Sequence, residues 1–385
     1  MKTLYIVLKI TERCNLNCSY CYYFNGLDKS FKSKPAAITI DVVEQVADFL
    51  IQGIKDYSID SLGITLHGGE PMLLNKQAFS RVCNILETKL KPHLKKFIIL
   101  LQTNGTLITK EWIDLFKKYQ IKLGISLDGL KDNHDYYRVS HQGKGSYDRI
   151  IQSIKLLNLE GYDFGILSVI DPSYSPKNIF KKLIIPYKIT GMDFLWPDFT
   201  HDTPPPYSAV MYGKYITELF NYWVDHGDSS MQIRFFNSSI NLMLGEKGLI
   251  YGQGIENSKD AMHVLAIRSD GEVCPTDELM STNPKFYSAT GKTVYDSSMR
   301  DILSLPVFNN LTKAISVPPK ECNSCCWKIN CGGGNITNRF SMKNEFDNPS
   351  IYCEGLKMFY SNLLSHLLNN GVSKGIIAKN LQLQT

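Results

Sequence analysis

Long apolar runs are missing from this chain of 385 residues. No stretch approaches the roughly 18 to 20 consecutive apolar residues that a membrane helix needs. Glu12, Arg13 and Cys14 stand where a signal peptide would carry its apolar region and cleavage site. A large excess of one charge is also missing, because 42 Lys and Arg face 37 Asp and Glu, a net charge of +5. The sequence therefore predicts a cytoplasmic protein that binds neither nucleic acid nor a membrane.

Cysteine is absent from the middle of the chain, since none of the ten cysteines lies between Cys83 and Cys274. Seven of them form two tight groups at opposite ends of the sequence: Cys14, Cys18 and Cys21, and Cys322, Cys325, Cys326 and Cys331. In a reducing compartment, grouped cysteines indicate metal binding before disulfides.

Short β-branched runs alternate with amphipathic stretches as far as about residue 198. The expected strands are Leu4–Ile10, Leu62–His67, Phe97–Thr103, Lys122–Leu127, Phe164–Ile170 and Met192–Trp196. The expected helices are Asp41–Ile54, Lys76–Lys89, Lys110–Lys117, Tyr147–Leu157 and Pro176–Ile185. This alternation predicts an α/β fold with a parallel sheet, and six strands suggest a partial (β/α)6 barrel. Functional residues should then follow the carboxyl ends of the strands.

The rest of the chain has a different pattern, and the Pro-rich stretch 203–206 marks the change. We expect helices within residues 208–245, a hairpin over 267–274 and a last helix over about 352–368. The predicted division is a barrel over 1–200, a helical linker region over 201–264 and a cluster-binding domain over 265–385.

The spacing Cys14-x3-Cys18-x2-Cys21 directly follows the first expected strand. Three thiolates on one loop can hold three irons of a [4Fe–4S] cube, and the fourth iron is then open to a small ligand. A structural zinc site is the alternative, but such sites have four ligands, and no fourth Cys or His lies nearby in the sequence.

This pattern resembles the radical S-adenosylmethionine (SAM) superfamily. Its C-x3-C-x2-C signature is intact, with Tyr20 at the customary aromatic position. Three further motifs resemble the family at the expected strand ends: Gly68-Gly69-Glu70-Pro71, Gln102-Thr103-Asn104-Gly105 and Ser126-Leu127-Asp128-Gly129. The resemblance implies a [4Fe–4S] cluster that binds SAM and a barrel of the radical SAM type.

The resemblance also implies which residues bind SAM. The segment Gly68, Gly69 and Glu70 would contact the methionyl amine, because a backbone without Cβ permits close approach. Ser126 and Arg138 are candidates for the carboxylate, which a guanidinium fork matches. Tyr20 would contact the adenine, and Asn104 belongs to the same set. The alternatives are ordinary surface roles for Ser126 and Arg138 and a packing role for Tyr20.

The second group resembles the SPASM extension of enzymes that modify peptides and proteins. Cys322, Cys325, Cys331 and Cys353 match the ligands of its outer auxiliary [4Fe–4S] cluster, and a zinc site is the alternative. The inner auxiliary cluster lacks its ligands, since Thr276 and Asn335 stand where the family has Cys. We therefore expect one auxiliary cluster, with Cys274 and Cys326 as spare thiols or alternative ligands.

Asp277 aligns with an acid that lies beside the substrate in sulfatase-maturing relatives, so it is the candidate catalytic base; a turn carboxylate is the alternative. The local sequence around the motifs most resembles maturases of the darobactin type, which join an aromatic side chain to a neighbouring residue. The expected function is therefore C–C or ether crosslinking, with Trp the expected aromatic residue, in a ribosomally made precursor peptide by a 5′-deoxyadenosyl radical. An electron donor such as flavodoxin or ferredoxin is implied.

Two alternatives remain open for the function. One is the sulfatase-maturing reaction, in which a Cys or Ser is oxidised to formylglycine. The other is a catalytically silent protein that binds peptides. A silent relative is expected to lose the first cysteine group or the segment 68–70, and both are intact here.

Overall fold

Strand β1 (Thr3–Thr11) lies inside the sheet that organises the first part of the chain. In the computed structural model, which describes residues 2–227, 230–255, 264–283 and 290–382, β1 pairs in parallel with β2 (Ser61–Gly68) and with β8 (Val264–Ile267). Beyond β2, the parallel order continues through β3 (Lys96–Thr103) to β4 (Lys122–Ser126). The predicted α/β fold with a parallel sheet is confirmed.

The chain divides into two compact units. Unit 1 contains residues 1–127, 131–166 and 262–310, and unit 2 contains 128–130, 167–261 and 311–385. This division differs from the expected boundaries at 200 and 264, because β8 joins the sheet beside β1. The antiparallel strand β9 (Val273–Cys274) follows it into unit 1. Residues 256–263 of the expected linker lie outside the described residues.

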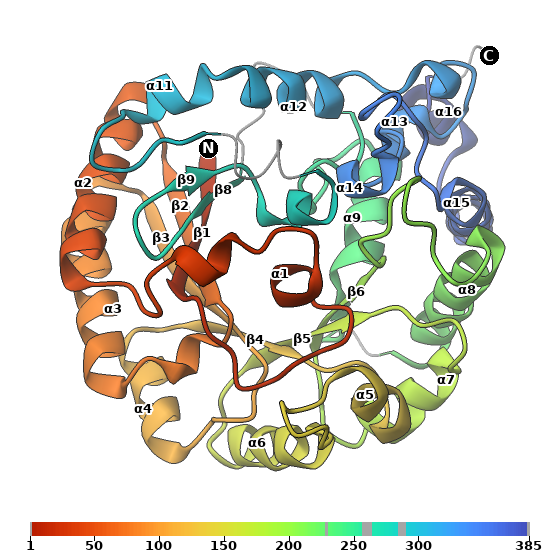
Figure 1. Cartoon of the computed structure of the whole chain (residues 1–385). Coiled ribbons are helices and arrows are strands. Elements are labelled where there is room, and N and C mark those ends of the chain that lie inside the picture. Colours follow the sequence, from red (N-terminus) through yellow and green to blue (C-terminus); the bar gives the residue numbers. More distant parts are fainter. Residues whose placement is uncertain (1, 228–229, 256–263, 284–289, 383–385) are drawn as a thin grey trace. The chain divides into compact units, whose positions relative to one another are not determined.

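Unit 1 contains helices as well as the sheet (Figure 1). They are α1 (Tyr22–Asn25), α2 (Ile40–Tyr57), α3 (Lys76–Leu90), α4 (Lys110–Lys118), α5 (Lys131–Tyr137), α6 (Tyr147–Leu159) and α11 (Met299–Leu303). The side chains of Thr39 and Asn75 accept hydrogen bonds from the first turns of α2 and α3, so each start is capped. These two helices lie side by side against the strands.

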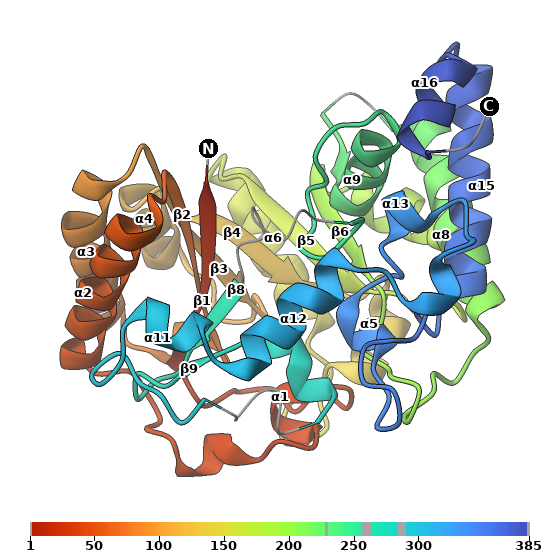
Figure 2. The same ribbon diagram turned by 90° about the horizontal axis from the view of Figure 1, so that it is seen from above.

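Unit 2 is mainly helical (Figure 2). It contains α7 (Pro176–Ile179), α8 (Ala209–His226), α9 (Arg234–Met243), α13 (Lys328–Cys331), α14 (Ile336–Arg339), α15 (Cys353–Asn369) and α16 (Lys374–Asn380), with parallel strands β6 (Gly191–Leu195) and β7 (Gln232–Ile233). Helices α8 and α15 pack closely, because a Cβ on Gly213 would lie 2.4 Å from the Cα of Gly355. Strand β5 (Phe164–Val169) and helix α12 (Pro306–Ser316) each span a boundary between the units.

All six expected strands and the main expected helices are present. The expected helix over 176–185 is α7 followed by a π-helical turn over Phe180–Ile184. The expected hairpin is β8 and β9. Short α1 and α5 were not predicted, because four to seven residues carry too little periodicity. Among the described residues, no helix is long and apolar enough to cross a membrane.

Candidate active site and cluster-binding loops

The carboxyl ends of β1 and β2 meet through backbone hydrogen bonds. The Gly69 amide donates to the Thr11 carbonyl at 3.0 Å, and the Glu70 amide donates to the Arg13 carbonyl at 2.8 Å. Gly68 has a φ of +130°, and a Cβ on Gly69 would lie 2.1 Å from the Arg13 oxygen. Glycine is therefore required because the loop that leads to the first cysteine already occupies this space.

The carboxylate of Glu70 joins the ends of β2 and β3. One oxygen accepts from the Met72 amide at 3.1 Å and from the Thr103 hydroxyl at 2.7 Å, and the other accepts from the Asn104 amide at 2.7 Å. Burial raises the pKa of Glu70 to about 6, although these hydrogen bonds act in the opposite direction. Both carboxylate oxygens of Glu70 therefore already accept hydrogen bonds from the segments at the ends of β2 and β3.

The three cysteines of the first group lie close enough to affect one another. Burial raises the pKa of Cys14 to about 12, and the nearby thiols of Cys18 and Cys21 raise it further. The amide nitrogen of the Asn104 side chain lies 3.9 Å from the Cys14 sulfur. Such thiols become thiolate ligands only when a strong positive charge, such as that of iron, is bound beside them.

A second segment brings Arg138 to the cysteine loop. The amide of Asn17 donates to the Val139 carbonyl at 2.7 Å, so the loop runs beside the segment that carries Arg138. The guanidinium of Arg138 lies 5.4 Å from the centre of the Tyr20 ring. The structure therefore brings these two candidates together. The hydroxyl of Ser126, at the end of β4, accepts a hydrogen bond from the Gln102 side chain at 2.9 Å.

Asp277 begins the 3-10 turn η5 (Asp277–Ser281) and is only 6% exposed. Its carboxylate accepts hydrogen bonds from the ammonium of Lys9, which is fully buried, and from the Tyr22 hydroxyl at 2.9 Å. Burial by itself would raise the pKa of Asp277, but the adjacent Lys9 charge and these contacts lower it to about 2. Asp277 is thus a carboxylate, the form that accepts a proton.

His67 completes this group, since its Nδ1 lies 3.1 Å from the Lys9 nitrogen. Burial, together with the Lys9 charge, lowers the pKa of His67 to about 3, so the neutral ring accepts a hydrogen bond from Lys9. Lys9, Tyr22 and His67 were not predicted as site residues from the sequence. Lys9 could have been predicted as a site residue, because it is the one charged residue within the expected strand Leu4–Ile10.

The expected ligands of the auxiliary cluster surround one pocket in unit 2. Its lining includes the four expected ligands Cys322, Cys325, Cys331 and Cys353. Burial raises the pKa of Cys331 to about 12, and the neighbouring thiols raise it further. Trp327 and Tyr360 line the same pocket, with their rings stacked at 5.9 Å between centres. Four converging thiols in one apolar pocket fit a cysteine-ligated cluster.

The positions without an inner-cluster ligand have structural contacts instead. Asn335 caps α14 by accepting a hydrogen bond from the Thr337 amide at 2.8 Å. Cys274 is fully buried in an apolar cluster with Tyr23, whereas Cys326 is exposed beside Cys325. Across the described ranges, no three His, Cys, Asp or Glu side chains could hold one metal ion together. A four-iron cube takes one thiolate per iron, so its ligands are spaced more widely.

Comparison with known proteins identifies the fold around the first loop. The family model described as the Radical SAM superfamily matches residues 8–179. This region is a radical SAM domain. The matched residues contain the Cys14–Cys21 loop, the segment 68–70 and Arg138. The resemblance to the superfamily is therefore confirmed over residues 8–179.

Curated relatives extend the similarity along the whole chain. A cysteine-type anaerobic sulfatase-maturating enzyme of Clostridium novyi (strain NT) is 26% identical over 95% of this chain and 97% of its own length. A serine-type enzyme of Bacteroides thetaiotaomicron is 23% identical over 95% of this chain and 91% of its own length. Similarity therefore continues well beyond residues 8–179.

A solved structure described as native anSMEcpe with bound AdoMet and Cp18Cys peptide has the same fold. It has a TM-score of 0.80 and 21% identity, and the match covers 96% of this chain and 98% of that one. The expected fold, a radical SAM domain followed by a C-terminal domain, is confirmed. The specific resemblance to crosslinking enzymes of the darobactin type stays a prediction.

Proposed function

We propose that this radical SAM enzyme oxidises a side chain of a peptide or protein substrate and that Asp277 accepts the proton that the substrate loses. The observation that carries this proposal is the buried carboxylate of Asp277, held ionised by Lys9 and oriented by Tyr22. A general base must be ionised and fixed before the reaction begins. Neither contact is needed merely to close a turn.

The cofactor proposal follows the two cysteine groups. Cys14, Cys18 and Cys21 would hold a [4Fe–4S] cluster with one iron open to SAM. When bound, the cluster and SAM supply a 5′-deoxyadenosyl radical, which removes a hydrogen atom from an unactivated carbon. SAM would contact the residues expected from the sequence: Tyr20, Gly68, Gly69, Glu70, Asn104, Ser126 and Arg138. The carboxylate of Glu70 already accepts three hydrogen bonds from the chain. We therefore propose that Glu70 contacts SAM through its backbone and not through its side chain.

The four thiols of the second group would hold one auxiliary [4Fe–4S] cluster. A cytoplasmic electron donor such as flavodoxin or ferredoxin would supply the electron that starts each turnover. In the balanced reaction, the hydrogen atom goes to the 5′-deoxyadenosyl group and the proton goes to Asp277. One electron leaves to an iron–sulfur acceptor, so the substrate loses two hydrogens in total.

Formylglycine formation from a Cys or Ser side chain is the first candidate for this oxidation. Its support is the similarity to both cysteine-type and serine-type sulfatase-maturating enzymes over nearly the whole chain. A Ser side chain that loses two hydrogens becomes the aldehyde directly, whereas a Cys side chain must also exchange sulfur for oxygen with water.

Crosslinking to an aromatic side chain, with Trp as the expected partner, is the second candidate. It is favoured by Thr276 and Asn335, which replace two cysteine ligands of the inner cluster. Loss of a nearby electron acceptor makes a simple oxidation harder, while addition of a carbon radical to a neighbouring ring is unaffected. Joining two carbons also removes two hydrogens from the peptide.

The test is anaerobic turnover with three peptides that contain Cys, Ser or Trp, combined with tandem mass spectrometry. The Ser and Trp products should each be about two mass units lighter. A crosslinked segment resists backbone fragmentation, whereas a formylglycine peptide fragments normally. The variant Asp277→Asn should still form 5′-deoxyadenosine but little product. Unchanged product yield in this variant would remove Asp277 from the reaction.

A further inference from the structure

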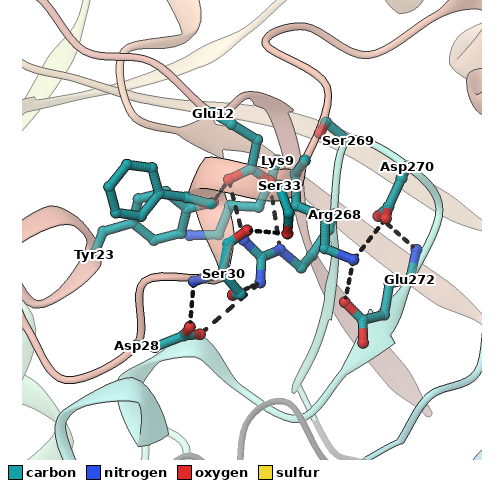
Figure 3. Close-up of polar contacts among 12 residues, drawn as sticks. Lys9, Glu12, Tyr23, Asp28, Ser30, Ser33, Arg268, Ser269, Asp270 and Glu272 are labelled. Atoms are coloured by element: carbon teal, nitrogen blue, oxygen red, sulfur yellow. Dashed lines mark hydrogen bonds and ion pairs between the residues drawn. The ribbon is translucent and has the colours of Figure 1, made fainter.

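A buried ion pair stands at the ends of two neighbouring parallel strands. Glu12 follows β1 and Arg268 follows β8, and both side chains are fully buried (Figure 3). The guanidinium lies 3.3 Å and 3.5 Å from the two carboxylate oxygens through its NH2 and Nε nitrogens. Glu12 lies two residues before Cys14, so the pair joins the cysteine loop to the hairpin.

Arg268 also reaches the chain on the other side of the cysteine loop. Its NH1 nitrogen donates to the Ser30 hydroxyl and lies 3.9 Å from a carboxylate oxygen of Asp28. Asp28 is 5% exposed and its carboxylate accepts from the Ser30 amide at 2.7 Å. One guanidinium therefore holds both flanks of the segment that carries Cys14, Cys18 and Cys21.

The same contacts continue from Arg268 to Asp277. Glu12 accepts a hydrogen bond from the Tyr23 hydroxyl. The Tyr23 ring has the Lys9 ammonium 4.8 Å from its centre and the Arg268 guanidinium at 6.0 Å. Lys9 in turn pairs with Asp277. The chain of contacts therefore runs from the hairpin turn, through the base of the cysteine loop, to the proposed catalytic carboxylate.

Stability alone gives little reason for this arrangement. Burying two charges costs about as much as their attraction returns, and apolar replacements of buried pairs often leave a protein equally stable. What a forked guanidinium adds is fixed geometry, because its planar donors hold several acceptors in set directions. A catalytic group displaced by about 1 Å can lose activity on the order of 100-fold.

We propose that Arg268 is a positioning residue that fixes Asp277 relative to the cysteine loop. This inference rests on the proposed role of Asp277 and deepens it. Arg268 holds the turn of the hairpin, just after β8, by its pair with Glu12, and β9, which returns from this turn, ends three residues before Asp277. The carboxylate of Asp277 is thereby held in a fixed position relative to the cysteine loop.

A second ion pair between the same two segments provides a matched control. The ammonium of Lys34 lies 2.6 Å from Asp270 and 2.8 Å from Glu272. These two acidic residues are at the turn of the hairpin (Figure 3). The Lys34 side chain is 16% exposed, so this pair is nearer to solvent and worth less. It joins the same segments through Asp270 and Glu272, outside the chain of contacts that runs through Glu12, Tyr23 and Lys9.

The experiment compares Arg268→Lys, the neutral double variant Arg268→Met with Glu12→Gln, and Lys34→Met in anaerobically reconstituted enzyme with the Ser peptide or the Trp peptide. We expect both Arg268 variants to retain the iron content and the rate of 5′-deoxyadenosine formation. Their product per 5′-deoxyadenosine should fall about 10- to 100-fold. Lys34→Met should match the parent. The double variant removes both partners, so it does not leave Glu12 buried and unpaired.

Hydrogen exchange gives a readout that needs no turnover. Amides of the hairpin, 264–274, should exchange faster in the Arg268 variants than in Lys34→Met. The positioning role would be overturned if the double variant kept the parent's product per 5′-deoxyadenosine and the parent's hydrogen exchange in the hairpin. Loss of iron in Arg268→Lys would overturn it as well. The variant Asp277→Asn separates failure of the positioning role of Arg268 from failure of the proposed role of Asp277 as the base. If Asp277→Asn loses product while the Arg268 variants do not, only the positioning role is wrong.

Discussion

The exchange Lys9→Met tests how Asp277 is kept ionised. Lys9 is fully buried and contacts Asp277 directly, and Met has a similar length without the charge. Burial alone raises the pKa of Asp277, and Lys9 is the first of the groups that lower it from 3.8 to about 2. That lowering corresponds to about 2 kcal/mol in favour of the carboxylate. Without Lys9, burial should raise the pKa of Asp277 towards neutral pH, because full burial can raise the pKa of a carboxyl group by about 3 to 5 units.

The sign of the pH dependence should reverse in this variant. In the parent, the ionised Asp277 adds stability above pH 3.8, and this contribution is lost as the pH falls towards 2. In Lys9→Met, the buried carboxylate is unpaired, so its ionisation costs stability as the pH rises. Removing one partner of a buried pair typically costs about 3 to 5 kcal/mol, which lowers the melting temperature on the order of 10 °C.

The assay measures product per 5′-deoxyadenosine between pH 6 and pH 9, with melting temperatures over the same range. The parent ratio should not change with pH, because Asp277 is ionised throughout. The Lys9→Met ratio should be lower at pH 6 and recover as the pH rises. Lys34→Met removes a more exposed ammonium and should behave like the parent. A Lys9→Met enzyme with parental yield at every pH would refute the reasoning.

Two further predictions concern the clusters and the loop that holds the first one. The reconstituted enzyme should hold about eight irons. Replacing Cys14, Cys18 and Cys21 by Ala should leave about four irons and abolish SAM cleavage. About twelve irons in the parent enzyme would show a third cluster. Gly69→Ala should reduce iron at the first site, because its Cβ would lie 2.1 Å from the Arg13 carbonyl oxygen. Gly63→Ala, within β2, is the control: its Cβ would lie 2.7 Å from the side-chain ring of Tyr5, which is 51% exposed and can move, and 3.5 Å from Leu100, an ordinary contact. Equal iron loss in both variants would contradict this steric argument.

The sequence by itself determined the elements and the two cysteine groups. Strands and helices follow from the local periodicity of apolar residues, which depends on neighbours only a few positions apart. The carboxyl ends of parallel strands lie at one edge of a sheet, so motifs that follow successive strands are expected to meet there. Cys14, Gly69 and Asn104 do meet at this edge. The four proposed ligands of the auxiliary cluster, Cys322, Cys325, Cys331 and Cys353, also line one pocket.

Only the tertiary structure decided which polar side chains meet around Asp277. Lys9 is 268 positions from Asp277, and Glu12 is 256 positions from Arg268. No periodic pattern links residues so far apart, because their contact depends on β8 pairing with β1 rather than with a strand near it in the chain. Lys9 and Arg268 each look like a misplaced charge beside an apolar strand. The fold places Asp277 beside Lys9 and Glu12 beside Arg268. Because these charges are buried, each side chain is held in place by its partner.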